Sequence, residues 1–204
     1  MTKKPTKKVA KKSSPKPPKT IYQFKITLLG IEPRIWRRIQ IPDCKLNTLH
    51  YHIQAAMGWS NSHLHHFVIG RARYGIPKWL DDPHVRTKVI DSTKTKLSDI
   101  LPADTERMKF KYTYDFGDYW EHEVSYEGTV ELSPETKYPI CIEGERACPP
   151  EDCGGIGGYE YLLEVLDDPS HEEHQGMKEW AGDLDPEKFE LKIATVRMVR
   201  ALRG

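Results

Sequence analysis

Apolar and polar residues alternate along the first part of the chain with the two-residue period of a half-buried β-strand. The alternation runs through residues 21–28 (IYQFKITL) and returns through residues 35–41 (IWRRIQI) after a turn at Gly30. Two such runs close together predict an antiparallel hairpin. Because Arg37 and Arg38 make the second run charged, we expect it to be an edge strand.

The clearest alternation lies in residues 108–116, where every second residue is apolar or aromatic. Gly117 and Asp118 supply a turn, and a second strand is predicted from residue 119 toward residue 132. His122 falls among the apolar positions of this second strand, so we expect its imidazole on the buried face. A shorter β-like run occupies residues 63–70.

A helical period replaces this alternation in residues 48–57 and through much of the last third of the chain. Asn47 or Thr48 can cap the first helix, and Gly58 can end it. The later helices are predicted at residues 159–166, 171–181 and 186–202. The last of them has an apolar stripe made of Phe189, Ile193, Val196 and Val199.

This order of elements predicts an α+β fold, in which an antiparallel or mixed sheet from the first two thirds is packed by helices that are mostly C-terminal. The expected core residues are Phe24, Ile26, Ile53, Phe110, Tyr112, Trp120, Leu162 and Ile193. We expect one domain over residues 21–204.

Residues 1–20 differ from the rest of the chain in composition. They hold eight of the 31 basic residues, four prolines and none of the 30 acidic residues, so the other residues carry a formal charge of −7. Because this segment has almost no apolar material, we expect a disordered lysine-rich tail. Such a tail either makes weak contact with nucleic acid through its charge or only aids solubility.

The composition also bears on the compartment. No apolar run approaches the roughly 18 residues that a membrane span needs, and the N-terminus lacks the apolar stretch of a secretory signal. We therefore expect a cytoplasmic protein with no membrane partner. Its four cysteines are then reduced thiols or metal ligands rather than a disulfide framework.

Three of the cysteines lie in a segment that offers little core material, residues 141–158. Cys141, Cys148 and Cys153 with His122 as fourth ligand make a candidate structural zinc site, and bound zinc would hold this segment in place. Three alternatives stay open. The thiols can be unliganded with His122 bonded to a backbone carbonyl, the fourth ligand can be another residue, or the cysteines can have a redox role.

A second candidate site is rich in histidine. His50 precedes the strand that holds His63 and His65, and Asp115 and Asp118 flank the turn at residue 117. His63 and His65 share a strand face and, with His122 or with Asp115 and Asp118, could form a metal site with nitrogen and oxygen ligands or an acid–base pair. The catalytic candidates are His50, His65, Asp115 and Asp118. Aspartates beside a turn glycine also bond to the turn backbone, which is the structural alternative.

Several strings resemble one protein family. They are YQFKITLLGIEPRIWRRIQIP, LHYHIQAAMGWSNSHLHHF, YDFGDYWEHEV and the segment from CPPEDCGG to DPEKFEL, which together extend over residues 21–191. The chain resembles the plasmid Ri open-reading-frame-three-like family, which implies a compact α+β domain linked to mobile elements. Members are sometimes labelled as transposon passenger or resolvase-like proteins. A serine resolvase needs an activated serine among arginines and a helix-turn-helix, and neither can be placed in this sequence, so we discount that label.

Three classes of function remain. The first is a binding or interaction domain of a mobile-element-associated family, with a structural zinc site and weak nucleic-acid contact through the tail. The second is a metal-dependent hydrolase or nuclease-like enzyme that uses the histidine and aspartate candidates. The third is a domain whose cysteines and histidines serve packing alone. Because no catalytic signature occurs, the sequence favours a binding domain over an enzyme.

Overall fold

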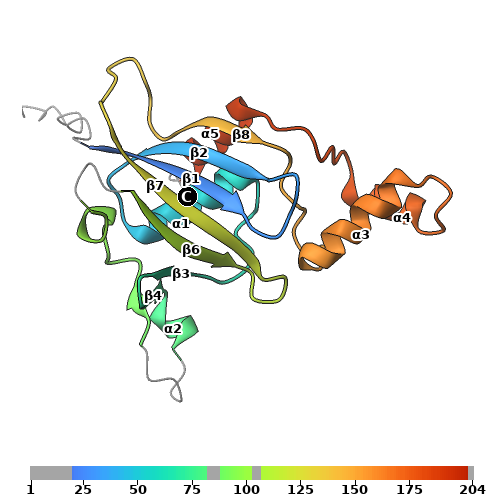
Figure 1. Cartoon of the computed structure of the whole chain (residues 1–204), viewed down its shortest axis with the longest axis horizontal. Helices are drawn as coiled ribbons and strands as arrows, with labels where there is room; N and C mark the ends of the chain where they lie inside the picture. The colour runs from blue at the N-terminus through green and yellow to red at the C-terminus, as the bar shows by residue number, and fades with distance from the viewer. Residues whose placement is uncertain (1–19, 82–87, 103–106, 202–204) are drawn as a thin grey trace, which may run out of the picture.

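The computed structural model describes residues 20–81, 88–102 and 107–201 (Figure 1). The strands are β1 (Ile21–Leu28), β2 (Trp36–Pro42), β3 (His65–Ile69), β4 (Ala72–Gly75), β5 (Ile90–Asp91), β6 (Met108–Tyr114), β7 (Trp120–Val130) and β8 (Ile140–Glu145). The helices are α1 (Leu46–Met57), α2 (Pro77–Leu80), the 3-10 helix η1 (Leu97–Asp99), α3 (Gly155–Asp167), α4 (His174–Ala181) and α5 (Leu191–Arg200). Among the described residues, no helix combines the length and the apolar character required to cross a membrane.

The eight strands form one sheet in the order β5-β4-β3-β6-β7-β1-β2-β8. Neighbouring strands are antiparallel except for the pair of β4 and β5, which is parallel. The predicted α+β fold with an antiparallel or mixed sheet is therefore confirmed. Of the described helices, α1 lies in the first third of the chain, while α3, α4 and α5 lie in the last third.

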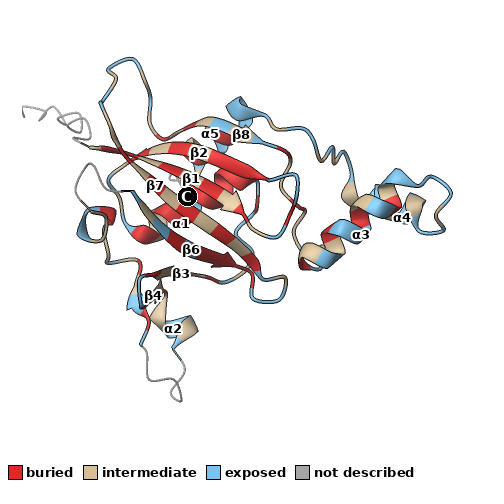
Figure 2. Cartoon of the chain, in the orientation of Figure 1, coloured by how far each residue is buried: buried red, intermediate tan, exposed pale blue. Residues whose placement is uncertain are grey.

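The core lies between one face of the sheet and the helices α1 and α5 (Figure 2). Apolar side chains at alternate positions of β1, β6 and β7 point to this face, as their period predicted. Seven of the eight expected core residues are at most 4% exposed, namely Phe24, Ile26, Ile53, Phe110, Tyr112, Trp120 and Leu162. His122 is also fully buried on this face.

The expectation for the last helix was wrong in its bounds and its face. α5 begins at Leu191, and Ile193 and Val196 are 43% and 46% exposed. Ala194 and Met198, one turn apart, are buried instead. The small side chain of Ala194 lets the helix backbone lie close to its neighbours, so the face was decided by fit rather than by the largest apolar residues.

The second strand is not an edge strand, contrary to expectation. β2 lies between β1 and β8, and β8 takes the edge of the sheet. Arg37 points into the core and is 1% exposed, whereas Arg38 points to the opposite face and pairs with Glu127 and Glu143. Cys141, expected in a loop, lies on β8. Alternation alone did not reveal that a later strand would cover the charged one.

Candidate functional site

Three segments that are far apart in the chain meet at one end of the sheet: residues 58–65, residues 114–118 and residues 148–155. Glu151 joins them, because its Oε1 accepts hydrogen bonds from the Ser60 backbone N–H at 2.7 Å and from the Tyr114 hydroxyl at 3.0 Å. Asp118 adds a further link by accepting a hydrogen bond from the Gly154 backbone N–H at 3.1 Å. The loop that carries Cys148 and Cys153 is thus attached to the other two segments by hydrogen bonds.

The segment between β8 and α3 is also held by a buried guanidinium. Arg37 donates hydrogen bonds to four backbone carbonyls, those of Trp36, Ala56, Glu145 and Arg146, at 2.7–3.0 Å. Burial lowers the pKa of Arg37, but the four acceptors replace water around its charge. Stabilisation that the sequence led us to expect from zinc is provided here by hydrogen bonds.

The four predicted zinc ligands are Cys141, Cys148, Cys153 and His122, and all of them lie in the described part of the chain. No three of their donor atoms lie within 4.8 Å of one another, as a shared metal would require. Nδ1 of His122 lies 3.1 Å from the Trp120 carbonyl, which is the structural alternative considered for this residue. The structure therefore does not assemble this ligand set, and zinc binding by the cysteines stays a prediction.

The thiols themselves lie in surroundings that keep them protonated. Burial raises the pKa of Cys148 well above its ordinary value and that of Cys153 to about 12. Burial also raises the pKa of Cys141. Since the thiolate is the nucleophile and the metal ligand, a raised pKa disfavours the form of these cysteines that would react or bind a metal.

The predicted histidines His50 and His65 come together. Their rings stack with centroids 3.4 Å apart and an interplanar angle of 5°. Nδ1 of His50 lies 2.8 Å from the Tyr112 hydroxyl, and its Nε2 lies 2.6 Å from Oδ1 of Asn61. Burial lowers the pKa of His50 to about 4 and that of His65 to about 2, so both rings are neutral at physiological pH.

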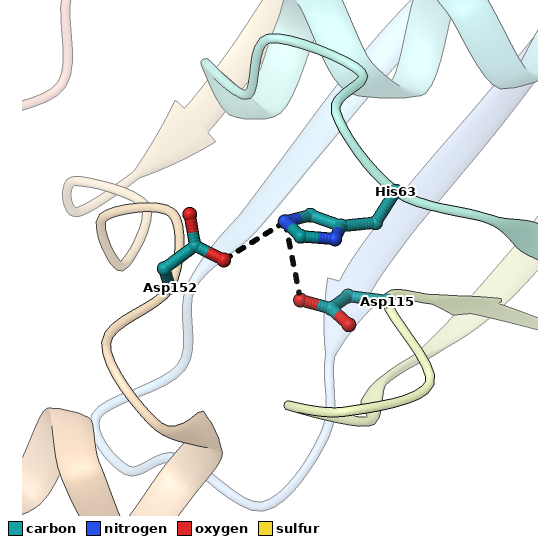
Figure 3. Close-up of side chains that lie close together, drawn as sticks. All are labelled: His63, Asp115 and Asp152. Carbon is teal, nitrogen blue, oxygen red and sulfur yellow. Dashed lines mark ion pairs between the residues drawn. The ribbon is translucent and has the colours of Figure 1, made fainter.

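The two predicted aspartates separate. Asp118 bonds to the loop at Gly154, whereas Asp115 faces His63 (Figure 3). Asp115 also supports its turn, because its Oδ1 accepts a hydrogen bond from the Gly117 backbone N–H at 2.8 Å. The structural alternative considered for this turn is thus present, and the second oxygen of Asp115 remains for another partner.

His63, Asp115 and Asp152 form the one group of three or more potential metal-ligand side chains that the described residues bring within 4.8 Å. Nε2 of His63 lies 2.9 Å from Oδ1 of Asp152 and 3.5 Å from Oδ2 of Asp115 (Figure 3). The side chain of Asp115 is 8% exposed and that of His63 is 30% exposed, whereas that of Asp152 is 70% exposed. One side of the group therefore faces solvent.

The sequence predicted part of this group. His63 and Asp115 were both candidates for a site with nitrogen and oxygen ligands, and the structure brings them together, whereas nothing in the sequence pointed to Asp152 as a ligand. Both aspartates have left-handed backbone, with φ of 55° at Asp115 and 58° at Asp152, which non-glycine residues adopt only where local structure requires it. Aspartate tolerates this conformation, but nothing in the local sequence indicated that the two turns would meet at His63.

A pocket of about 400 Å³ adjoins the group, and His63 belongs to both. The stacked His50 and His65 also line this pocket, between α1 and the start of β3. The structure therefore places three of the predicted histidines around one hollow, with the two carboxylates beside it.

Comparisons with known proteins agree with the fold. The chain is 40% identical over 169 residues to the uncharacterised protein y4hQ of Sinorhizobium fredii, covering 81% of this chain and 83% of that protein. A crystal structure of protein MM3350 from Methanosarcina mazei Go1, of unknown function, superposes with a TM-score of 0.74 at 38% identity, covering 85% of this chain and 96% of that one. Residues 20–193 match the family of plasmid pRiA4b ORF-3-like proteins. The chain belongs to the plasmid pRiA4b ORF-3-like protein family.

Proposed function

We propose that this chain binds one divalent metal ion through Nε2 of His63, Oδ2 of Asp115 and Oδ1 of Asp152. The observation that carries the proposal is the convergence of these three atoms within 4.8 Å, from three separate segments of the chain. Hydrogen bonds of Glu151, Asp118 and Asp115 fix the segments that carry the ligands. A site supported in this way does not depend on the metal for its shape.

The separations between the ligand atoms suit one ion. Ligands about 2.1 Å from a metal are about 3.0 Å apart at octahedral angles and about 3.4 Å apart at tetrahedral angles. Oδ1 of Asp152 and Oδ2 of Asp115 lie 2.9 and 3.5 Å from Nε2 of His63. Both separations from Nε2 are therefore close to those between two ligands of one shared ion.

The charge of the three side chains and the surroundings of Nε2 of His63 also support a metal at this position. Two carboxylates beside one imidazole carry a net negative charge whether or not His63 is protonated, and a divalent cation neutralises it. Nε2 of His63 is buried and has no hydrogen-bond partner, although two carboxylate oxygens lie near it. The two oxygens lie close to Nε2 without being aligned for a hydrogen bond, which is an arrangement that a metal ion shared by all three atoms would suit.

The ligand types indicate the metal class. One imidazole and two carboxylates suit Zn²⁺, Mn²⁺ or Fe²⁺ better than Ca²⁺, which prefers oxygen ligands alone. Three protein ligands and the exposed side of Asp152 leave coordination positions for water or for another molecule. The proposed function is therefore still that of a binding domain, as the sequence favoured, but its metal ligands are His63, Asp115 and Asp152 rather than the cysteines.

A second candidate function is metal-dependent hydrolysis, and the open side of the group favours it. A metal held by His63, Asp115 and Asp152 would supply Lewis-acid chemistry and would lower the pKa of a water molecule at its open side. The adjoining pocket offers room for a substrate. Contact of the tail with nucleic acid stays a prediction, since residues 1–19 lie outside the described residues.

Calorimetric titration of the metal-free protein with Zn²⁺ and with Mn²⁺ tests the proposal. We expect one equivalent to bind, and Asp152→Asn to weaken binding at least tenfold because it removes a charged ligand. Asp118→Asn is the matched control, since asparagine still accepts the bond from Gly154 and Asp118 is not a ligand.

Three outcomes decide between the sites. Equal affinity in the parent, Asp152→Asn and His63→Asn would refute the proposed site. Loss of binding in Cys148→Ser alone would move the metal to the cysteine loop. Metal-dependent cleavage of bis(p-nitrophenyl) phosphate that Asp152→Asn abolishes would establish the hydrolytic candidate, and a metal that binds without such cleavage leaves the binding role.

A further inference from the structure

The pocket beside His63 has the features of a ligand site in its own right. It has a volume of about 400 Å³ and lies between α1, residues 61–65 and α2. None of the ten described residues that line it is lysine, arginine, aspartate or glutamate. Its lining therefore offers no charged partner for a strongly anionic or cationic ligand.

Polar atoms in the lining lack partners. Nε2 of His65 is buried without a hydrogen-bond partner, in a residue that is 8% exposed. Oδ1 of Asn47, on the first turn of α1, is likewise buried and unpartnered. An unmade hydrogen bond in a buried group costs about 1–3 kcal/mol, so these two atoms point to a ligand with its own donors and acceptors.

Exposed aromatic rings form another part of the lining. Trp79 on α2 is 57% exposed and Tyr51 on α1 is 36% exposed, and both line the pocket. Large aromatic side chains left in solvent beside a polar hollow offer flat faces on which another ring can stack. Asn61 and Ser62 supply amide and hydroxyl groups to the same lining.

We propose that this pocket binds a nucleobase, a neutral planar heteroaromatic ring with hydrogen-bond donors and acceptors along its edge. Stacking on Trp79 or Tyr51 satisfies the face of such a ring, and side-chain amides of the type of Asn47 and Asn61 read its edge. The neutral lining suits a free nucleoside, because a phosphate would find no cationic side chain there and would lie near Asp115 and Asp152.

The proposal is independent of the proposed metal, although His63 lines the pocket and belongs to the metal group. The test therefore uses the full-length protein in EDTA. Binding of adenosine, guanosine, cytidine and uridine is measured by saturation-transfer NMR and then by calorimetry. We expect at least one nucleoside to bind, and binding to persist in Asp152→Asn.

Two exposed tryptophans give a matched pair of variants. Trp79→Ala should weaken nucleoside binding about tenfold, the usual effect of losing one stacking ring. Trp180→Ala is the control, because Trp180 is 51% exposed on α4 and does not line the pocket. Asn47→Ala provides a second test by removing the unpartnered oxygen without changing the aromatic face.

The proposal is overturned if no nucleoside binds, or if Trp79→Ala and Asn47→Ala both leave the affinity unchanged. Tighter binding of an uncharged disaccharide such as maltose than of any nucleoside would also overturn it, since sugars share the neutral hydrogen-bonding groups but lack the aromatic ring. Neither outcome depends on the metal titration, so each proposal can fail without the other.

Discussion

Replacing Arg37 by methionine should cost more stability than almost any other single change in the sheet. Methionine keeps much of the aliphatic volume of arginine, and it removes the donors that reach the carbonyls of Trp36, Ala56, Glu145 and Arg146. These hydrogen bonds connect Arg37 to Ala56 near the end of α1 and to Arg146 just after β8. Its loss therefore affects the packing of the helix and the position of the site loop together.

The size of the effect follows from the burial of these groups. A hydrogen bond to a charged donor contributes about 1.5–3 kcal/mol, but each carbonyl has a second lone pair and the terms are not additive. Removal of the buried charge itself recovers part of its desolvation cost. If the four bonds together are worth about twice one such bond, we expect a net loss of about 3–5 kcal/mol, which is a large part of the roughly 5–15 kcal/mol that stabilises a domain.

Arg38→Met is the matched control, because the adjacent residue points to the other face of β2. Its side chain is 24% exposed and forms ion pairs with Glu127 and Glu143. Partly exposed pairs contribute about 0–1 kcal/mol, so this variant should remain close to the parent. The comparison separates the buried carbonyl network from the general effect of removing an arginine from this strand.

The assay is equilibrium unfolding in urea followed by tryptophan fluorescence, with the slope checked for two-state behaviour. Should Arg37→Met fail to fold, Arg37→Lys gives the smaller loss expected when the charge remains but the planar set of donors is gone. A cost below about 1 kcal/mol for Arg37→Met, equal to that of Arg38→Met, would refute the reasoning.

Two further changes test burial on the helices. Burial lowers the pKa of His52 to about 4 from its ordinary 6.5, so the unfolded chain binds the proton more tightly and stability should fall as the pH drops from about 6.5 to about 4. His52→Leu, which loses no hydrogen bond at the unpartnered Nδ1, should make urea midpoints fall less steeply across that window, while the lowered pKa values of His50 and His65 maintain the rest of the fall; a slope equal to that of the parent would contradict this. Ala194→Glu should lower the free energy of unfolding by about 3 kcal/mol or more, because Ala194 is 4% exposed, whereas Ile193→Glu should lower it by less than about 1 kcal/mol, because Ile193 is 43% exposed. Similar losses of both variants in urea unfolding would mean that the buried face of α5 is misassigned.

The strands and the first helix were predictable because their information is local. A two-residue period places Phe24 and Trp120 on one face of their strands, and Gly58 ends α1 with a φ of 119°. The same period placed His122 in the core. In these elements the tertiary packing agrees with the local pattern, so the pattern was sufficient to predict which residues are buried.

Strand order and helix orientation were not predictable in this way. β2 became an interior strand because β8, about a hundred residues later in the chain, covers it, and this changed Arg37 from a solvated edge residue into a buried donor. α5 buried Ala194 rather than Ile193 because close packing favours the residue that fits the available space.

For the candidate site as well, some features follow from local sequence and others only from the tertiary structure. The sequence by itself determined the α+β class, the buried position of His122 and the residue types that have metal-binding chemistry. The tertiary structure alone decided that Asp115 meets His63 and Asp152 while the predicted cysteine ligands do not converge. The reason is physical: ligands must lie within a few ångströms of each other in space, and that separation is set by the packing of distant segments, which no local period records.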